Sequence, residues 1–210
     1  LPLVTTRVWL PVKMGPFALP VPQTVHRSIH GPVIKNDKGY FAIRYAGIDS
    51  VKAVEQYYRN TKATNWDEWS KSMSIGGVPA TNFIYADKTG RVAYIYNALF
   101  PDRKPGYDYT KLLPGDTSAV IWAGPVGFDR YPKVVDPASG FVQNANNTPF
   151  LAAGPGSEMD PSAYSPYLGI ELGMTNRGLR ATELLAADTS ITPDELLAIK
   201  MDMTYSKQSW

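Results

Sequence analysis

The sequence of 210 residues contains no cysteine, which excludes disulfides, thiolate metal sites and a cysteine nucleophile within it. Histidine is also scarce, because His26 and His30 are the only two. Two histidines are too few for a convincing zinc site, and no His-Glu-x-x-His motif occurs. A Gly-x-Ser-x-Gly nucleophile elbow is absent as well, so nothing local supports a serine triad built on His30. We therefore expect His30 to be structural rather than catalytic.

Long apolar runs and phosphate-binding loops are missing too. No stretch reaches the length of a membrane span, and the net charge of +2 gives no case for nucleic acid or an anionic membrane surface. Leu1 begins a stretch with neither an initiator Met nor the pattern of a signal peptide, so we interpret it as a processed or cut end, or as the start of a partial chain. Hydrophobic residues make up 44% and charged residues 19%, as in a folded globular protein.

Apolar periodicity and turn residues predict a mixture of strands and helices. Five prolines indicate that residues 1–24 are an edge or extended segment. The other predicted elements are a strand over 40–46, a helix over 51–59 capped by Asp49-Ser50, a helix capped by Asn65 with Glu68 three residues later, a hairpin of 81–86 and 91–98, short strands over 119–123 and 140–145, and helices after 168 and after Thr192. We expect loops over 100–118 and 150–167. No repeat or linker divides the chain.

Three asparagines lie at the end of the strand predicted over 140–145: Asn144, Asn146 and Asn147. Asparagine is a poor strand former, so the cluster needs a physical reason. One reason is turn chemistry, because Asn tolerates left-handed backbone and bonds its own main chain. The other is catalysis, because a carboxamide N–H on a rigid element can donate to an oxyanion. Alternation along a strand predicts that Asn144 and Asn146 share one face, but spacing does not choose between them.

Several stretches together resemble a known family. They are His30-Gly31-Pro32-Val33-Ile34, Asn65-Trp66-Asp67-Glu68-Trp69, Tyr85-Ala86-Asp87-Lys88-Thr89-Gly90, Pro101-Asp102-Arg103, and Asn144-Ala145-Asn146-Asn147-Thr148-Pro149. They are similar, in the same order, to motifs in the large (beta) chain of the penicillin acylases, which are N-terminal-nucleophile (Ntn) hydrolases. The resemblance covers roughly residues 25–200. Gln143 and Phe150 look more like the acyl-homoserine lactone and aculeacin A (lipopeptide) acylases than the penicillin G enzymes.

The resemblance implies an α+β fold, part of the Ntn-hydrolase αββα sandwich, to which this chain would contribute hairpins and peripheral helices. It also implies an amide hydrolase that forms an acyl-serine intermediate, with an N-terminal serine as nucleophile and its own α-amine as base. Residue 1 is Leu, so that serine would lie outside this chain. We therefore interpret residues 1–210 as a single segment, without internal boundary, of a larger acylase catalytic domain. Its expected partners are the small alpha chain and the Ser-bearing start of the beta chain, and alone it should be inactive.

Two site residues follow from the resemblance. Asn146 matches the asparagine whose side-chain amide helps to form the family's oxyanion hole. Arg180 matches the arginine of the family's Asp-Arg-x-Thr-Glu helix, which lies near the amine of the nucleophile. Arg177 is a rival one turn earlier, and an ordinary surface or ion-paired role is the alternative for either arginine. Leu179 replaces the acid that usually precedes this arginine in the family.

We predict no cofactor or metal for this chain, although calcium is possible in the complete protein, where Asp160 would offer a hard oxygen ligand. Asp102, Arg103 and Asp108 are expected to form an ion pair that pins their loop. Candidate substrates are small-molecule acyl amides: β-lactams, acyl-homoserine lactones or lipopeptides. The alternatives are a non-catalytic relative that binds an acyl ligand, and a carbohydrate-binding module that uses exposed Trp66 or Trp122. The resemblance to the family also implies a periplasmic or secreted location.

Overall fold

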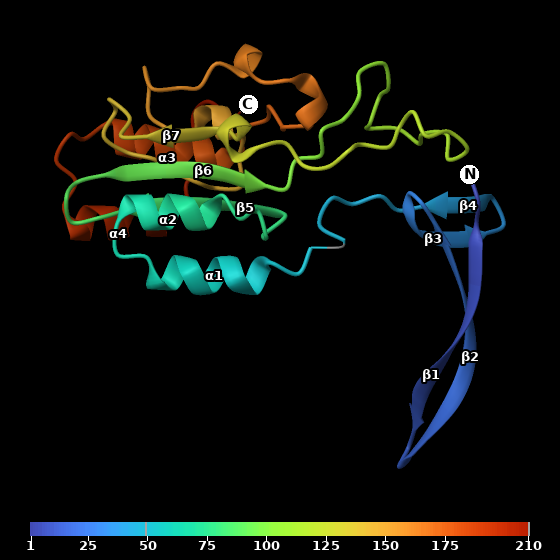
Figure 1. Cartoon of the computed structure of the whole chain (residues 1–210). Coiled ribbons are helices and arrows are strands. Elements are labelled where there is room, and N and C mark those ends of the chain that lie inside the picture. Colours follow the sequence, from blue (N-terminus) through green and yellow to red (C-terminus); the bar gives the residue numbers. More distant parts are fainter. Residues whose placement is uncertain (49, 210) are drawn as a thin grey trace.

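A computed structural model describes residues 1–48 and 50–209 and contains two antiparallel sheets (Figure 1). The first has the order β1-β2-β3-β4 and the second the order β5-β6-β7. The strands are β1 (Val4–Met14), β2 (Phe17–Ser28), β3 (Gly31–Asn36), β4 (Gly39–Ala42), β5 (Ala80–Ala86), β6 (Val92–Ala98) and β7 (Lys133–Val135). The first sheet lies to one side of the remaining elements, and β1 and β2 extend from it as a long two-stranded ribbon (Figure 1).

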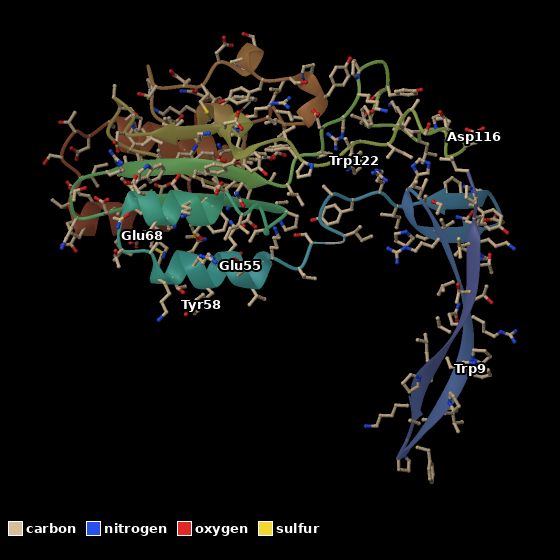
Figure 2. The ribbon with its side chains drawn as sticks, viewed as in Figure 1. Trp9, Glu55, Tyr58, Glu68, Asp116 and Trp122 are labelled. Carbon is tan, nitrogen blue, oxygen red and sulfur yellow. The ribbon has the colours of Figure 1, made fainter. Side chains whose placement is uncertain are left out.

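The predicted extended segment over residues 1–24 forms most of this ribbon. β1 is an edge strand, and β2 pairs with β3 only over residues 26–28. The prolines of β2 therefore lie where the strand has a partner on one side alone, which is where a residue without an N–H is tolerated. Trp9 projects from the ribbon with 61% of its surface exposed (Figure 2). The strand predicted over 40–46 is confirmed in part, because β4 ends at Ala42.

Four α-helices are found among the described residues: α1 (Ala53–Lys62), α2 (Trp66–Met73), α3 (Asn176–Ala186) and α4 (Pro193–Met201). Asn65 caps α2 as predicted, because its Oδ1 accepts from the backbone N–H of Glu68 at 3.0 Å. The carboxylate of Glu68 reaches back one residue further than expected, to the N–H of Thr64. Thr192 and Glu195 form a complete capping box at the start of α4.

The start of α1 differs from the prediction. The helix begins at Ala53, with Lys52 at its N-cap and no side-chain cap. Of the two predicted cap residues, Asp49 lies outside the described residues, and Ser50 lies two positions before the observed cap. Its N–H donates to the carbonyl of Gly47, so Ser50 belongs to the preceding turn.

Strand alternation divides the β5–β6 hairpin into two faces. On one face, Phe83 and Tyr85 pack with Ile95 against α2, around the buried side chains of Trp69 and Met73. Complete burial of a side chain such as Ile95 stabilises the fold by about 1.5–3 kcal/mol. The residue pairs Asn82–Tyr96 and Ile84–Tyr94 lie on the opposite face. The hairpin turn is the predicted one, with Gly90 at a φ of 92°.

Gln56 joins α1 to the second sheet through a buried hydrogen-bond network. Its Oε1 accepts from the N–H groups of Gly77 at 2.7 Å and Val78 at 3.1 Å. Its Nε2 donates to Oδ1 of Asn97 at 3.2 Å. Gln56 is fully buried, so this one side chain satisfies polar groups that have no access to water.

Two predicted strands are wrong. Residues 119 and 120 lie in a turn, in which the N–H of Ile121 donates to the carbonyl of Ser118, and residues 121–123 are irregular. Residues 140–145 contain only an isolated bridge between Val142 and Ala153. An apolar run of this length forms a strand only when another strand pairs with it. Neither run has such a partner among the described residues. The loops expected over 100–118 and 150–167 are irregular, apart from isolated bridges at Pro101 and Ala153 and 3-10 turns at Pro149–Leu151, Pro161–Ala163 and Pro166–Leu168.

Candidate functional site

The asparagine cluster forms a tight turn rather than a strand end. Asn146 has a φ of +57°, the left-handed conformation that Asn adopts more readily than most residues. Oδ1 of Asn144 accepts from the N–H of Asn146 at 3.1 Å and thereby closes the turn. The turn interpretation of the cluster is therefore confirmed. It does not exclude the catalytic interpretation, because the same turn fixes the position of the backbone from which the side chain of Asn146 projects.

The third asparagine holds the turn from inside. Asn147 is 1% exposed, whereas Asn144 and Asn146 are exposed. Its Oδ1 accepts from the N–H of Ala145 at 2.9 Å, and its Nδ2 donates to the carbonyl of Thr148 at 2.8 Å. The predicted separation of Asn144 and Asn146 from Asn147 is thus correct, although a turn produces it and not a strand.

The first turn of α3 is docked on this asparagine turn. Thr175, the N-cap of α3, donates from Oγ1 to the carbonyl of Ala145 at 3.1 Å. Arg177 donates from Nη2 to the same carbonyl at 3.2 Å and to Oδ1 of Asn146 at 2.9 Å. Gly178 allows this close approach, because a Cβ there would lie 3.0 Å from Oδ1 of Asn147. The N-cap and the first turn of α3 therefore fix the position of the asparagine turn.

A pocket of about 360 Å³ lies between the asparagine turn and the face of β5 and β6 that points away from α2. Nδ2 of Asn82 crosses to Oδ1 of Asn144 at 3.0 Å and ties the turn to β5. The lining residues are Ala80, Thr81, Asn82, Tyr96, Asn97, Ala98, Asn144, Asn146 and Glu171. The pocket thus combines several carboxamides with one carboxylate. Two other hollows, near His30 and between α1 and α2, contain neither Asn144 nor Asn146.

Two tyrosines beneath the pocket are held neutral. Burial raises the pKa of Tyr94 far above its usual value, and the nearby Tyr96 and Glu171 add to this effect. Burial is also the largest cause of the raised pKa of Tyr96, which additionally bonds Glu171. Both phenols therefore stay protonated at neutral pH and act as dipoles rather than charges. The ionisable groups around the asparagine turn are then chiefly Arg177 and Glu171.

Arg180, one turn after Arg177, bonds two carboxylates that do not line this pocket. Its Nε and Nη2 each donate to one oxygen of Asp202 at 3.0 Å, in a two-pronged pair. A longer bond of 3.4 Å joins it to Glu183. The pairing with Asp202 raises the pKa of Arg180 and lowers that of Asp202. The structure therefore brings the rival, Arg177, to Asn146, while the role of Arg180 as a site residue stays a prediction.

The other sequence-selected residues have structural partners. His30 is buried, and its Nε2 donates to the carbonyl of Gly115 at 3.1 Å. The prediction of an ion pair within the 102–108 loop is wrong. Nη1 of Arg103 donates to the carbonyls of Tyr167 and Leu168, because the partly buried guanidinium lies next to main chain rather than next to a carboxylate. The loop is pinned, but by backbone acceptors.

Three further side chains serve local structure. Oδ1 of Asp108 accepts from the N–H of Thr110 at 3.0 Å, and Oδ1 of Asp160 from the N–H of Ser162 at 2.8 Å. Trp122 is labelled in Figure 2, and Cζ of Arg44 lies 4.2 Å from the centre of its indole ring. One of the two ring faces on which a sugar could stack is thus already covered by an arginine.

Neither a membrane-spanning helix nor a cluster of metal-binding side chains is found among the described residues. No helix within 1–48 and 50–209 combines the length and apolarity needed to cross a bilayer. In the same residues, no group of three or more His, Cys, Asp or Glu side chains is placed to hold a metal ion.

Comparison with known proteins connects this arrangement to a family. The sequence model of the family described as penicillin amidase matches residues 1–209. Penicillin G acylase of Escherichia coli is 32% identical over 130 residues, which cover 60% of this chain and 15% of that protein. Acyl-homoserine lactone acylase PvdQ of Pseudomonas fluorescens is 24% identical over 208 residues, covering 84% of this chain and 26% of the relative. The chain thus spans about a quarter or less of the length of these relatives.

The fold agrees with these sequence matches. A penicillin G acylase from Alcaligenes faecalis, described as thermostable, superimposes with a TM-score of 0.73. The match covers 94% of this chain and 34% of that one at 23% sequence identity, so it bears on the fold alone. It confirms the predicted α+β class and the relation to an Ntn-hydrolase fold. With the family match running from residue 1 to residue 209, the chain belongs to the penicillin amidase family.

Proposed function

We propose that this chain forms one wall of the active site of an acylase, which hydrolyses the amide bond between an acyl group and a small amine. The observation that carries the proposal is the turn around Asn146, which presents a carboxamide at a pocket while both its backbone and its side-chain oxygen are held. Attack on an amide carbonyl creates an oxyanion, and a fixed neutral donor stabilises such a charge by about 3–4 kcal/mol. Asn146 is the donor in this proposal.

The nucleophile belongs to another segment of the same protein. In this proposal an N-terminal serine attacks the acyl carbon, its α-amine takes the proton, and water later releases the acyl group from the serine. Neighbouring segments of the processed precursor complete the site. The family match supports this division, because the chain spans only 15% and 26% of two relatives named as acylases.

Arg180 is proposed to contribute positive charge to the completed site. Support comes from its position in a stretch that resembles the family's arginine motif and from its place on α3, the helix that holds the asparagine turn. Its bonds with Asp202 fix the guanidinium and partly neutralise it. We therefore expect a smaller loss of turnover from Arg180→Met than from removal of the Asn146 amide.

The substrate is proposed to be an acyl-homoserine lactone, a lipopeptide or a β-lactam with an acyl side chain. The names of the relatives support the first and the last, since one is a penicillin G acylase and another an acyl-homoserine lactone acylase. A periplasmic or secreted location, which the resemblance to this family implies, is part of the proposal. Calcium in the complete protein remains a further expectation.

The decisive experiment uses the full-length protein. Intact mass and N-terminal sequencing of each chain come first, and a chain that begins with Ser is expected. Hydrolysis of the three substrate classes is then compared between the natural protein and Asn146→Gly. Glycine keeps the left-handed backbone and removes only the carboxamide, so kcat should fall by about 10²–10³-fold. An unchanged kcat would refute the role of Asn146. A protein without a Ser-initiated chain and without hydrolysis would be a binding relative instead.

A further inference from the structure

We infer that Glu171 selects the substrate by charge, because its carboxylate lines the pocket beside Asn146. The pocket then accepts an amine part that is neutral or cationic and disfavours one that carries a carboxylate. This inference rests on the proposed function, since it concerns which acyl amides the same site hydrolyses. Among the candidate substrates it favours an acyl-homoserine lactone, which is neutral, over a β-lactam whose bicyclic nucleus carries a carboxylate.

The lining of the pocket suits the amine part of a substrate rather than its acyl chain. Four asparagines, one threonine, one tyrosine and Glu171 line it, together with only two alanines. Sites that hold an apolar chain are lined mainly by hydrophobic and aromatic side chains. A compact polar group with its own donors and acceptors fits this wall better. The amine part of the substrate is therefore placed here, within reach of Glu171.

Glu171 has no cationic partner in the pocket. Among the described residues that line it, Glu171 alone carries a charge. None of the ion pairs formed within 1–48 and 50–209 includes Glu171. Arg177 does not line the pocket, and its Nη2 is engaged by Oδ1 of Asn146 and the carbonyl of Ala145. The negative charge of Glu171 therefore acts on a bound ligand without a neutralising group in the wall.

Two contacts keep this carboxylate at the pocket. The hydroxyl of Tyr96, a residue of β6, bonds it. Two residues after Glu171, the carbonyl of Gly173 accepts from the N–H of Thr148 at 3.1 Å, which joins the segment to the asparagine turn. A carboxylate can accept about four hydrogen bonds, so the phenol leaves acceptor sites for a ligand. An ammonium, hydroxyl or amide N–H can bind there, whereas a second carboxylate has no hydrogen to donate.

The small size of the pocket makes the charge effective. In about 360 Å³, a bound amine lies close to every lining side chain. Two like charges at such a separation near a protein surface change an equilibrium by about 4–20-fold. Repulsion of an unwanted partner is a general source of specificity. Because Glu171 is exposed, dissolved salt should screen this repulsion.

The test compares substrates of the full-length protein that differ in one charge. N-octanoyl-homoserine lactone is neutral, whereas its ring-opened form, N-octanoyl-homoserine, carries a carboxylate; the matching phenylacetyl pair and penicillin G extend the series. We expect the natural protein to show a higher kcat/KM for the lactone than for the ring-opened acid. Glu171→Gln should reduce this preference by about 4–20-fold, chiefly through faster turnover of the acid. Glu171→Lys should reduce it further.

Two controls separate charge from structure. Glu158→Gln removes another exposed carboxylate, one that does not line the pocket, and should leave the preference unchanged. A salt series on the natural protein needs no substitution: higher ionic strength should raise kcat/KM for the ring-opened acid and not for the lactone. The salt series also decides the question if the Glu171 variants do not fold.

The outcomes distinguish this inference from the proposed function. An unchanged preference in Glu171→Gln, with hydrolysis intact, would overturn selection by charge and leave the acylase proposal standing. A natural protein that hydrolyses the ring-opened acid faster than the lactone would overturn it as well. Equal losses for both substrates in Glu171→Gln would also count against it, because Glu171 would then serve structure or catalysis. Absence of hydrolysis of every amide by the natural protein would instead refute the proposed function.

Discussion

Replacing Gly178 with Ala tests whether the close contact between α3 and the asparagine turn controls the site. In an ordinary helix position the change would gain up to about 1 kcal/mol of helix propensity. Here the new Cβ would lie 3.0 Å from Oδ1 of Asn147 and 3.1 Å from Cε of Met174. Met174 can move aside, but Asn147 is buried and bonded at both ends of its amide.

Overpacking of this kind costs about 1–3 kcal/mol, so we expect a net destabilisation of up to about 2 kcal/mol despite the better helix former. The turn that carries Asn146 should shift with Asn147. The measurement is hydrogen exchange over residues 143–150 in the full-length protein, together with kcat. Gly173→Ala is the matched control, because a Cβ there meets nothing within 4 Å, and it should stabilise by about 0.4–1 kcal/mol. The reasoning fails if Gly178→Ala protects the turn as well as the control does.

Three further substitutions test features away from the pocket. Gln56→Leu leaves two buried N–H groups without an acceptor, each at a cost of about 1–3 kcal/mol. The free energy of opening that hydrogen exchange measures for their segment should therefore fall by about 2–6 kcal/mol. The control Gln23→Leu, at an exposed position, should change it little. The pKa of Asp87 is lowered to about 2, chiefly by the hydroxyl of Thr89, so its stabilisation of the hairpin turn is complete above about pH 4 and lost as pH falls through 2. An NMR titration should show this pKa rising in Thr89→Val. Thr192→Ala should cost about 1 kcal/mol and speed exchange at the start of α4, and unchanged exchange there would contradict the capping role.

The elements that the sequence predicted well are those specified by neighbouring residues. The cap of α2 at Asn65 and the capping box of Thr192 both act over three residues, and the hairpin turn ending at Gly90 needs only four. Local chemistry of this kind is readable without a fold. The wrongly predicted strands over 119–123 and 140–145 depend on distant residues instead, since a strand exists only where another segment of the chain pairs with it.

The site shows the same division between local and distant causes. The alternation of Asn144 and Asn146 with Asn147 was predictable because the three residues are adjacent. The partners that hold Asn146 come from α3, 30 and more residues later, and no local pattern announces them. Arg177 and Arg180 occupy the same helix one turn apart, so only the path of the chain decides which one meets the turn. The neighbouring Gly178 was a usable signal, because a glycine near a helix start often marks a close approach.

The prolines of the β1–β2 ribbon have a consequence for how the two strands find their alignment. Pro11 lies opposite Pro20, and Pro22 lies opposite Trp9, so all three fall in alternate residue pairs of the ladder. Antiparallel pairs alternate between hydrogen-bonded and unbonded, and a proline fits only the unbonded kind. A slip of one residue would place a proline where an N–H must donate. In a ribbon whose side chains are exposed on both faces, burial cannot select the register. The positions that lack an N–H donor select the register instead, so replacing Pro20 and Pro22 together should allow the two strands to shift against each other.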